Sequence, residues 1–268
     1  DLIRADPARL LRVAACDPEA HLSALMATAT TQVTTATSDA DAMTALRRMK
    51  AEAALLIALC DIGGVWPVMR VTAAVTDLAI HAVRLALHHA LMQEVGRGRL
   101  LPRVEDHPER GSGLIVLAMG KMGAHELNYS SDIDLIVFYE LEAPPLAADV
   151  EAPPFFVRLT QAVARLLQQR TADGYVFRVD LRLRPDPAST PVAISTAAAL
   201  DYYEREGRTW ERAAMIKALP CAGDAVAGER LIGDIAPFVW RRHLDFAALA
   251  DVHDMKRQMQ AFKGHGDI

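Results

Sequence analysis

The chain has 268 residues, of which 51% are hydrophobic and 24% are charged, and its formal net charge is −5. This balance is typical of a soluble globular protein with one large domain or two ordinary ones, and it excludes an intrinsically disordered chain. The acidic balance argues against nucleic acid as the main partner. No unbroken apolar run reaches the roughly 18 residues of a membrane span, so no membrane partner is expected.

The cysteines and the first residue bear on the origin of the chain. Cys16, Cys60 and Cys221 are odd in number and far apart, and no C-x-x-C pair occurs. This pattern favours reduced thiols in a cytoplasmic protein over a zinc site or a disulfide framework. The chain begins with Asp1 and shows no basic-then-apolar leader, so we expect a piece of a longer protein.

Residues 1–97 are predicted to form an N-terminal helical region. Ser38 and Asp41 resemble a capping box at the start of a helix that Gly63 ends. A longer helix is expected to run from Pro67 to Gly96. The apolar stripes of these helices imply that they pack against one another or against a neighbouring domain.

A mixed core is predicted over residues 98–220. Three short apolar runs read as strands and one amphipathic stretch reads as a helix: LIVLAMG, DIDLIVFYE and YVFRVDLRLRP for the strands, and FFVRLTQAVARLLQQR for the helix. From Ala197 onward the pattern is helical again, and residues 221–268 are expected to be a C-terminal helical segment that begins a truncated following region. This order of elements is typical of the α+β class.

Two aspartates open the second predicted strand. Asp132 and Asp134 lie two residues apart, so they share one face of the strand at a spacing of roughly 6.5–7 Å. Two carboxylates at the end of an otherwise apolar strand repel each other unless a cation joins them. A divalent ion such as Mg²⁺, held by carboxylates, phosphate oxygens and water, meets that need.

The third predicted strand adds a carboxylate among arginines. Asp180 shares one face of this strand with Arg178, Arg182 and Arg184, and the opposite face is apolar. If this strand lies near the first pair, Asp180 becomes a third metal ligand. Arg182 and Arg184 would then bind phosphate oxygens, which suit the planar guanidinium, whereas Arg178 is assigned to a solvated strand face.

A glycine turn follows the first predicted strand. Gly120 and Lys121 open a predicted helix, where backbone N–H groups can approach an anion. The turn is neither a Walker A loop nor a Rossmann G-x-G-x-x-G motif. An exposed turn lysine is the alternative interpretation of Lys121.

A glycine turn, a D-x-D at a strand start and a later single Asp together resemble the polymerase-β-like nucleotidyltransferase superfamily. The strings MGKMGAHELNYSSDIDLIVFYE, FRVDLRLRP and DYYEREGRTWERAAMIKA resemble the glutamine-synthetase adenylyltransferase family over about residues 113–246. DYYEREGRTWERAAMIKA followed by PFVWRRHLDF is similar to that family's N-terminal, adenylyl-removing copy.

The resemblance implies a polymerase-β-like core with helical segments on both sides, and catalytic metal ligands at Asp132, Asp134 and Asp180 for Mg²⁺ or Mn²⁺. Contacts to substrate or phosphate are assigned to Gly120, Lys121, Ser131, Arg182, Arg184, Glu211 and Lys217. Three of these residues have a simpler interpretation. Ser131 would be an ordinary loop residue, and Glu211 and Lys217 would form surface pairs on a helix.

The activity that the resemblance implies is deadenylylation of glutamine synthetase. Inorganic phosphate would attack the AMP group of an adenylylated tyrosine and release ADP. The implied partners are adenylylated glutamine synthetase, nucleotide and phosphate, a PII-type nitrogen-signalling protein, and the rest of a parent chain that carries the adenylylating domain.

Three alternatives stay open beside this activity. The first is ATP-dependent adenylylation of the same tyrosine. The second is a non-catalytic module that binds nucleotide or a regulator, against which the three acids count because they are costly to bury. The third, a nucleic-acid polymerase, fits poorly with the acidic balance.

Overall fold

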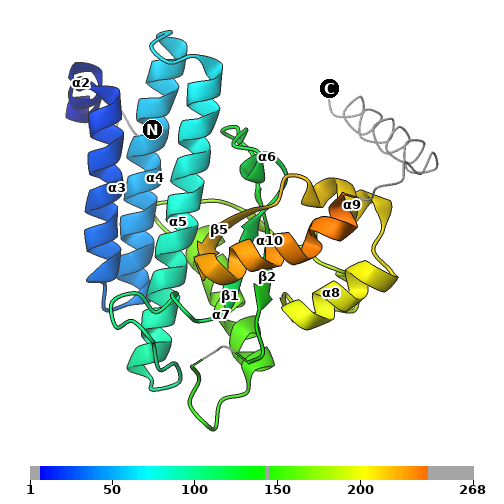
Figure 1. Ribbon diagram of the computed structural model, residues 1–268. Coiled ribbons are helices and arrows are strands. Elements are labelled where there is room, and N and C mark those ends of the chain that lie inside the picture. The colour runs from blue at the N-terminus through cyan, green and yellow to red at the C-terminus, as the bar shows by residue number, and fades with distance from the viewer. Residues whose placement is uncertain (1–6, 143–144, 241–268) are drawn as a thin grey trace.

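The computed structural model describes residues 7–142 and 145–240, so the end of the predicted C-terminal segment lies outside the described residues. The chain begins with a layer of helices beside a small sheet (Figure 1). These helices are α2 (Pro7–Ala15), α3 (Pro18–Thr34), α4 (Asp39–Ile62) and α5 (Val68–Gly96). The helices predicted before residue 97 are therefore present in the described residues.

The predicted helix boundaries in this layer are also confirmed. The Ser38 side chain accepts a hydrogen bond from the Asp41 backbone N–H, and Gly63 caps the C-terminus of α4. The N-cap of α5 is Pro67. Among the described helices, α5 is long and apolar enough to cross a membrane, but 67% of its most apolar window is buried inside the fold. Such burial is typical of the central helix of a bundle.

The sheet contains β1 (Leu114–Ala118), β2 (Ile133–Tyr139), β3 (Val179–Asp180), β4 (Ala193–Ser195) and β5 (Leu219–Gly223). Its strand order is β3-β2-β1-β5, with β4 also paired to β2. β1 runs antiparallel to β2 and β5, whereas β2 runs parallel to β3 and β4. This small mixed sheet with its helices confirms the predicted α+β class and is consistent with a polymerase-β-like nucleotidyltransferase core.

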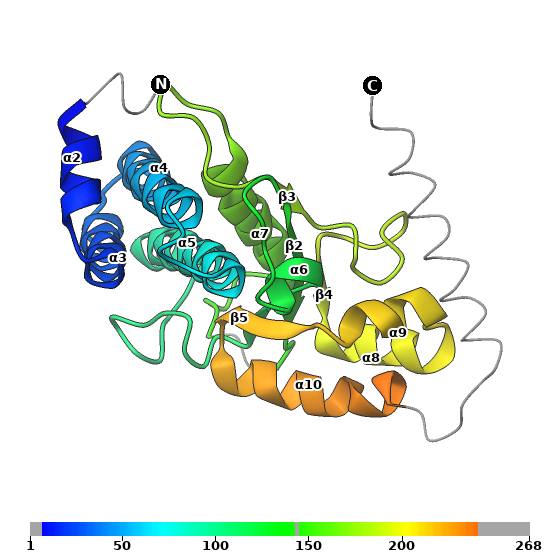
Figure 2. The ribbon, with the colours of Figure 1, turned by 90° about the horizontal axis from the view of Figure 1, so that it is seen from above.

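The two faces of β2 pack into different groups of core residues. Ile133 and Leu135 belong to the core shared with α5 and with α7 (Ala152–Gln168). Ile136 and Phe138 belong to the core that also includes residues of α8 (Thr196–Arg205), α9 (Thr209–Met215) and α10 (Ala225–Val239). Figure 2 shows these two groups of helices on opposite sides of the sheet. Because side chains alternate along a strand, Asp134 lies on the face of α8–α10.

The predicted third strand is much shorter than expected. β3 ends at Asp180, whose side chain accepts a hydrogen bond of 2.8 Å from the Arg182 backbone N–H. An aspartate that bonds the backbone two residues on forms an Asx turn, and this turn ends the strand. The expectation that Arg182 and Arg184 lie on a strand was therefore wrong, and both lie in the loop that follows.

The uninterrupted helical pattern predicted after Ala197 was also wrong. β5 interrupts it, with Pro220 and the positive-φ Gly223 inside the strand. Neither residue type favours a strand in the sequence, and only pairing with β1 makes this segment extended. The expected domain boundary at residue 220 falls inside β5, which keeps α10 with the core sheet.

Candidate functional site

Three carboxylates gather at one end of the sheet. Asp134 of β2 lies directly opposite Asp180 of β3 in a parallel pair, and Asp132 immediately precedes β2. The pairing of β2 with β3 thus brings together residues that are 46 positions apart, as the Arg178–Asp132 contact across the same strands also shows. The sequence predicted this grouping only on the condition that the two strands were neighbours.

Asp134 is the acid without a partner. Its half-buried carboxylate has no hydrogen bond or ion pair to any residue in the described part of the chain. Burial raises its pKa, and the neighbouring charges of Asp180 and Asp132 raise it further, against the opposing charges of Arg182 and Lys121. Among the three acids, Asp134 is therefore the one whose charge no direct contact in the described part of the chain neutralises.

Asp132 is held by Arg178, through its Nε. The same guanidinium donates to the Ser130 carbonyl at 3.0 Å and to the Tyr175 hydroxyl at 3.3 Å. The sequence interpretation of Arg178 as a solvated strand face missed this role. The sequence could not reveal this pair, because Asp132 lies 46 positions earlier in the chain.

Asp180 is held by Arg182. The Arg182 Nη2 lies 2.5 Å from Oδ2 of Asp180, and the Nε lies 3.0 Å from both carboxylate oxygens. These hydrogen bonds hold the pKa of Asp180 below its usual range. The Arg182 side chain is 83% exposed, so its guanidinium reaches the acid from the solvent side.

The donor chemistry of this site suits a divalent cation, although the side chains do not yet form a ligand cage. Within residues 7–142 and 145–240, no group of three or more His, Cys, Asp or Glu side chains is arranged to hold a metal ion. The reason is visible in the contacts, since Asp132 and Asp180 are turned to arginines. The unneutralised Asp134 between them is the feature that fits a cation.

The predicted glycine turn packs directly on Asp134. It forms the single-turn helix α6 (Gly120–Gly123), shorter than a helix of ordinary length. Gly120 has φ +55°, and a Cβ there would lie 2.9 Å from Oδ2 of Asp134. A Cβ at Gly123 would lie 1.9 Å from the Lys217 carbonyl oxygen. Glycine at both positions lets the turn approach the acid and the segment before β5.

Lysines and a serine lie around this turn. Lys121 is exposed, and its charge acts on Asp134. Lys217 forms an ion pair of 3.2 Å with Glu126, which joins the segment before β5 to the loop after α6. The alternative interpretation placed Lys217 on one helix with Glu211, as a surface-pairing residue. That interpretation was wrong, since α9 ends at Met215. Ser131 bonds Asn128 within its own loop, as the plain interpretation expected.

Two predicted phosphate contacts are engaged elsewhere. Arg184 is buried and donates to the carbonyls of Leu181 at 2.7 Å, Pro187 at 2.9 Å and Thr190 at 3.0 Å. Its Nε also faces the Thr190 carbonyl. A phosphate would have to displace these bonds, so the structure gives Arg184 the role of a loop anchor.

Glu211 is only 2% exposed and sits in the first turn of α9. It accepts hydrogen bonds from the Arg208 backbone N–H at 2.8 Å and from the Tyr202 hydroxyl at 3.1 Å. Burial raises its pKa. These contacts assign Glu211 to capping α9 rather than to an open phosphate site.

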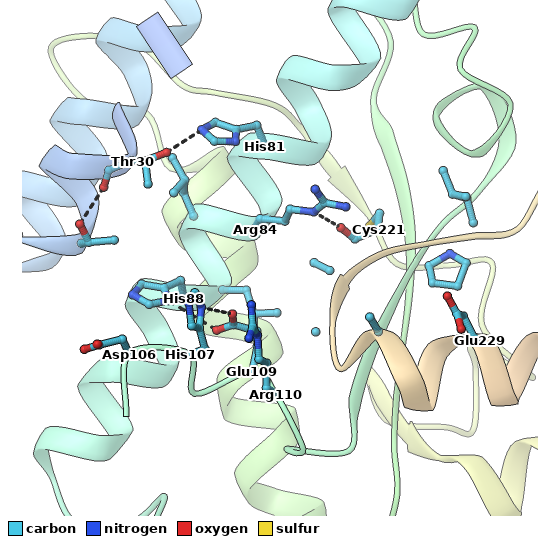
Figure 3. Close-up of a pocket in the computed structure, with 18 residues that line it drawn as sticks. Thr30, His81, Arg84, His88, Asp106, His107, Glu109, Arg110, Cys221 and Glu229 are labelled. Atoms are coloured by element: carbon cyan, nitrogen blue, oxygen red, sulfur yellow. Dashed lines mark hydrogen bonds and ion pairs between the residues drawn. The ribbon is translucent and has the colours of Figure 1, made fainter. Parts of the chain in front are cut away.

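A separate cavity of about 650 Å³ lies between α5, the 106–110 loop and β5 (Figure 3). None of the three acids lines it. Its wall carries His88 and His107, which lie 3.5 Å and 3.1 Å from Glu109. The neighbouring His89 of α5 is 2% exposed and bonds Asp39, so it belongs to the helical core and not to this cavity.

Comparison with known proteins assigns the chain to a family. The family model described as glutamate-ammonia ligase adenylyltransferase matches residues 2–232. The chain belongs to this family. It is 71% identical over its whole length to a protein of Rhodopseudomonas palustris named bifunctional glutamine synthetase adenylyltransferase/adenylyl-removing enzyme. Proteins of the same name match at 69% identity in Bradyrhizobium diazoefficiens and at 60% over 99% of the chain in Xanthobacter autotrophicus.

The alignments cover nearly all of this chain but only a small part of each relative. The chain is matched over 99–100% of its length, but it spans only 27% of the length of each of these relatives. The chain therefore aligns with one part of relatives whose name gives two activities.

Proposed function

We propose that this family member removes adenylyl groups from glutamine synthetase by phosphorolysis. The supporting observation is the unpartnered carboxylate of Asp134, packed against Gly120 and flanked by Asp132 and Asp180. The similarity of the DYYEREGRTWERAAMIKA segment to the family's adenylyl-removing copy favours removal over addition. The relatives' name, which includes an adenylyl-removing enzyme, agrees with that choice.

The proposed reaction replaces the phosphoester bond to tyrosine with the phosphoanhydride bond of ADP. An oxygen of inorganic phosphate attacks the phosphorus of the AMP group, and the bond from that phosphorus to the tyrosine oxygen breaks. The bonding electron pair stays on the phenolate, which takes the proton that hydrogen phosphate gives up. The products are ADP and an unmodified tyrosine. A phenol with a pKa near 10 leaves readily, so the reaction requires no dedicated acid.

Asp132, Asp134 and Asp180 are the residues proposed to hold Mg²⁺ or Mn²⁺. When bound, such a cation neutralises charge that grows on the transferred phosphoryl group and on the leaving oxygen. Gly120 keeps the space in front of Asp134 clear of a side chain. Lys121 and Arg182 are the residues proposed to bind phosphate oxygens, and the action of their charges on Asp134 supports that role.

The decisive experiment supplies adenylylated glutamine synthetase with phosphate and Mg²⁺ and measures ADP. The Asp134→Asn variant is expected to lose at least about a hundredfold in rate, since it removes the central carboxylate. Its circular dichroism spectrum is expected to match that of the unchanged chain. Full ADP release by a folded Asp134→Asn variant would refute the assignment.

The opposite reaction is the second candidate, because the relatives' name includes adenylyltransferase as well. Unmodified glutamine synthetase supplied with ATP and Mg²⁺ would then yield pyrophosphate. If this assay yields pyrophosphate and the first assay releases no ADP, adenylylation replaces deadenylylation as the proposed function. The predicted PII-type regulator, the dependence on the rest of a parent chain and the cytoplasmic location stay predictions.

A further inference from the structure

The two arginines that cover the acids are held in different ways. Arg178 contacts three groups: the Asp132 carboxylate, the Ser130 carbonyl and the Tyr175 hydroxyl. Arg182 bonds only Asp180 within the described part of the chain. Arg178 is therefore fixed by several groups of the surrounding loops. Arg182 approaches Asp180 from the solvent side and bonds that acid alone in the described residues.

Arg182 is the more easily displaced of the two. Its side chain is 83% exposed, and exposed ion pairs contribute little to stability. Its partner Asp180 is 18% exposed and belongs to the strand, so the acid keeps its position when the arginine leaves. Within residues 7–142 and 145–240, moving the Arg182 side chain breaks no hydrogen bond or ion pair other than those to Asp180.

Arg182 also stays within reach of the whole site. Its charge interacts with Asp134 and Asp132 as well as with Asp180. A guanidinium released from Asp180 therefore remains next to the place where the proposed phosphate must lie. Its planar fork binds two phosphate oxygens at once, as it binds two carboxylate oxygens here.

We propose that Arg182 is an exchangeable arm, which neutralises Asp180 while the site is empty and moves to the attacking phosphate once a divalent cation takes Asp180. Arg178 stays on Asp132 throughout and keeps that acid in place. The inference rests on the proposed function, since it requires a cation and a phosphate at this site. It makes Arg182 a phosphate-binding residue whose availability depends on the cation.

Mn²⁺ binding, followed by electron paramagnetic resonance with and without inorganic phosphate, tests the exchange without any turnover. In the unchanged chain, phosphate is expected to tighten Mn²⁺ binding severalfold, because each ligand favours the same position of Arg182. Arg182→Gln is expected to bind Mn²⁺ about three- to fivefold more tightly without phosphate, since the competing charge is gone. Phosphate should then have almost no further effect.

Two variants serve as controls. Arg205→Gln removes another exposed arginine, which pairs with Asp201 at 2.9 Å on α8, and should leave both measurements unchanged. Arg178→Gln removes the fixed arginine, and the tightening by phosphate should persist in that variant. Loss of this coupling in Arg178→Gln but not in Arg182→Gln would overturn the assignment of the mobile arm.

The outcomes separate this inference from the proposed function. If Arg182→Gln binds Mn²⁺ as the unchanged chain does and keeps the phosphate effect, the exchange is refuted. The proposed function survives that result when Asp134→Asn loses both Mn²⁺ binding and ADP release. If the unchanged chain binds no Mn²⁺, or Asp134→Asn binds it equally well, both proposals fall.

Discussion

Asp134 and Asp180 face each other across the parallel pair of β2 and β3, so two carboxylates occupy one cross-strand position. Like charges at directly opposite positions of a sheet destabilise it. The fold tolerates the pair because Arg182 covers one acid while the other stays half-buried with a raised pKa. This placement costs stability and is the best structural sign of a binding function.

Asp134→Asn is therefore expected to stabilise the metal-free chain, by about 0.2–1 kcal/mol of unfolding free energy, because it removes a like-charge pair. Urea unfolding at neutral pH measures the gain. A destabilised Asp134→Asn variant would contradict the repulsion inferred here.

The same gain should depend on pH. Asp134 has a raised pKa in the folded state, so the folded chain binds this proton more tightly than the unfolded chain does. The free energy of unfolding therefore falls as the pH rises through the folded pKa and the proton is lost. The advantage of Asp134→Asn should be full at neutral pH and shrink as the pH falls below the pKa of Asp134. Urea unfolding of both proteins with a chelator present, between pH 7 and pH 4, follows this change.

Gly120→Ala is predicted to damage both the turn and the acid. The positive φ costs an alanine about 1 kcal/mol, and its Cβ would press on Oδ2 of Asp134. Gly98→Ala is the matched control, with φ +68° and no atom within 4 Å of its Cβ. Both variants should lose similar stability, whereas only Gly120→Ala should weaken Mn²⁺ binding and ADP release. Equal losses of function in the two would exclude the steric argument.

Glu109 is predicted to stabilise the 106–110 loop against α5 in a pH-dependent way. Burial acts to raise its pKa, but hydrogen bonds from His88, its own backbone and His107 lower it to about 2. A lowered pKa contributes stability that is present above the unfolded value and is lost as the pH falls through the folded one. Glu109→Gln should lose about 1 kcal/mol at pH 6, after allowance for solvent screening, and almost nothing near pH 2. Thermal unfolding at both pH values tests this.

Glu211 distinguishes a structural role from a phosphate contact. Glu211→Gln keeps an acceptor for the Arg208 N–H and removes a buried charge, so stability and ADP release should change little. Glu211→Ala loses the cap and leaves the Tyr202 hydroxyl unpaired, at a cost of about 1–2 kcal/mol. A large loss of ADP release in a stable Glu211→Gln variant would instead place this residue in the site.

Local signals in the sequence determined the helices and the central strands. Ser38 and Gly63 delimit α4 through contacts made within a few residues, and β1 and β2 follow from short apolar runs. The chemical character of the site could also be predicted, because the spacing of Asp132 and Asp134 puts two carboxylates at the start of an apolar strand wherever that strand lies in a sheet. These features depend on neighbouring residues alone.

Only the tertiary structure decided which arginine pairs with which acid. Arg178 meets Asp132 because β3 pairs with β2, and Arg184 turns into its own loop because the Asx turn at Asp180 ends the strand. β5 likewise exists through its pairing with β1, against the local preference of Pro220. Pairings of this kind join residues far apart in the chain, and their energies come from contacts that no local pattern encodes.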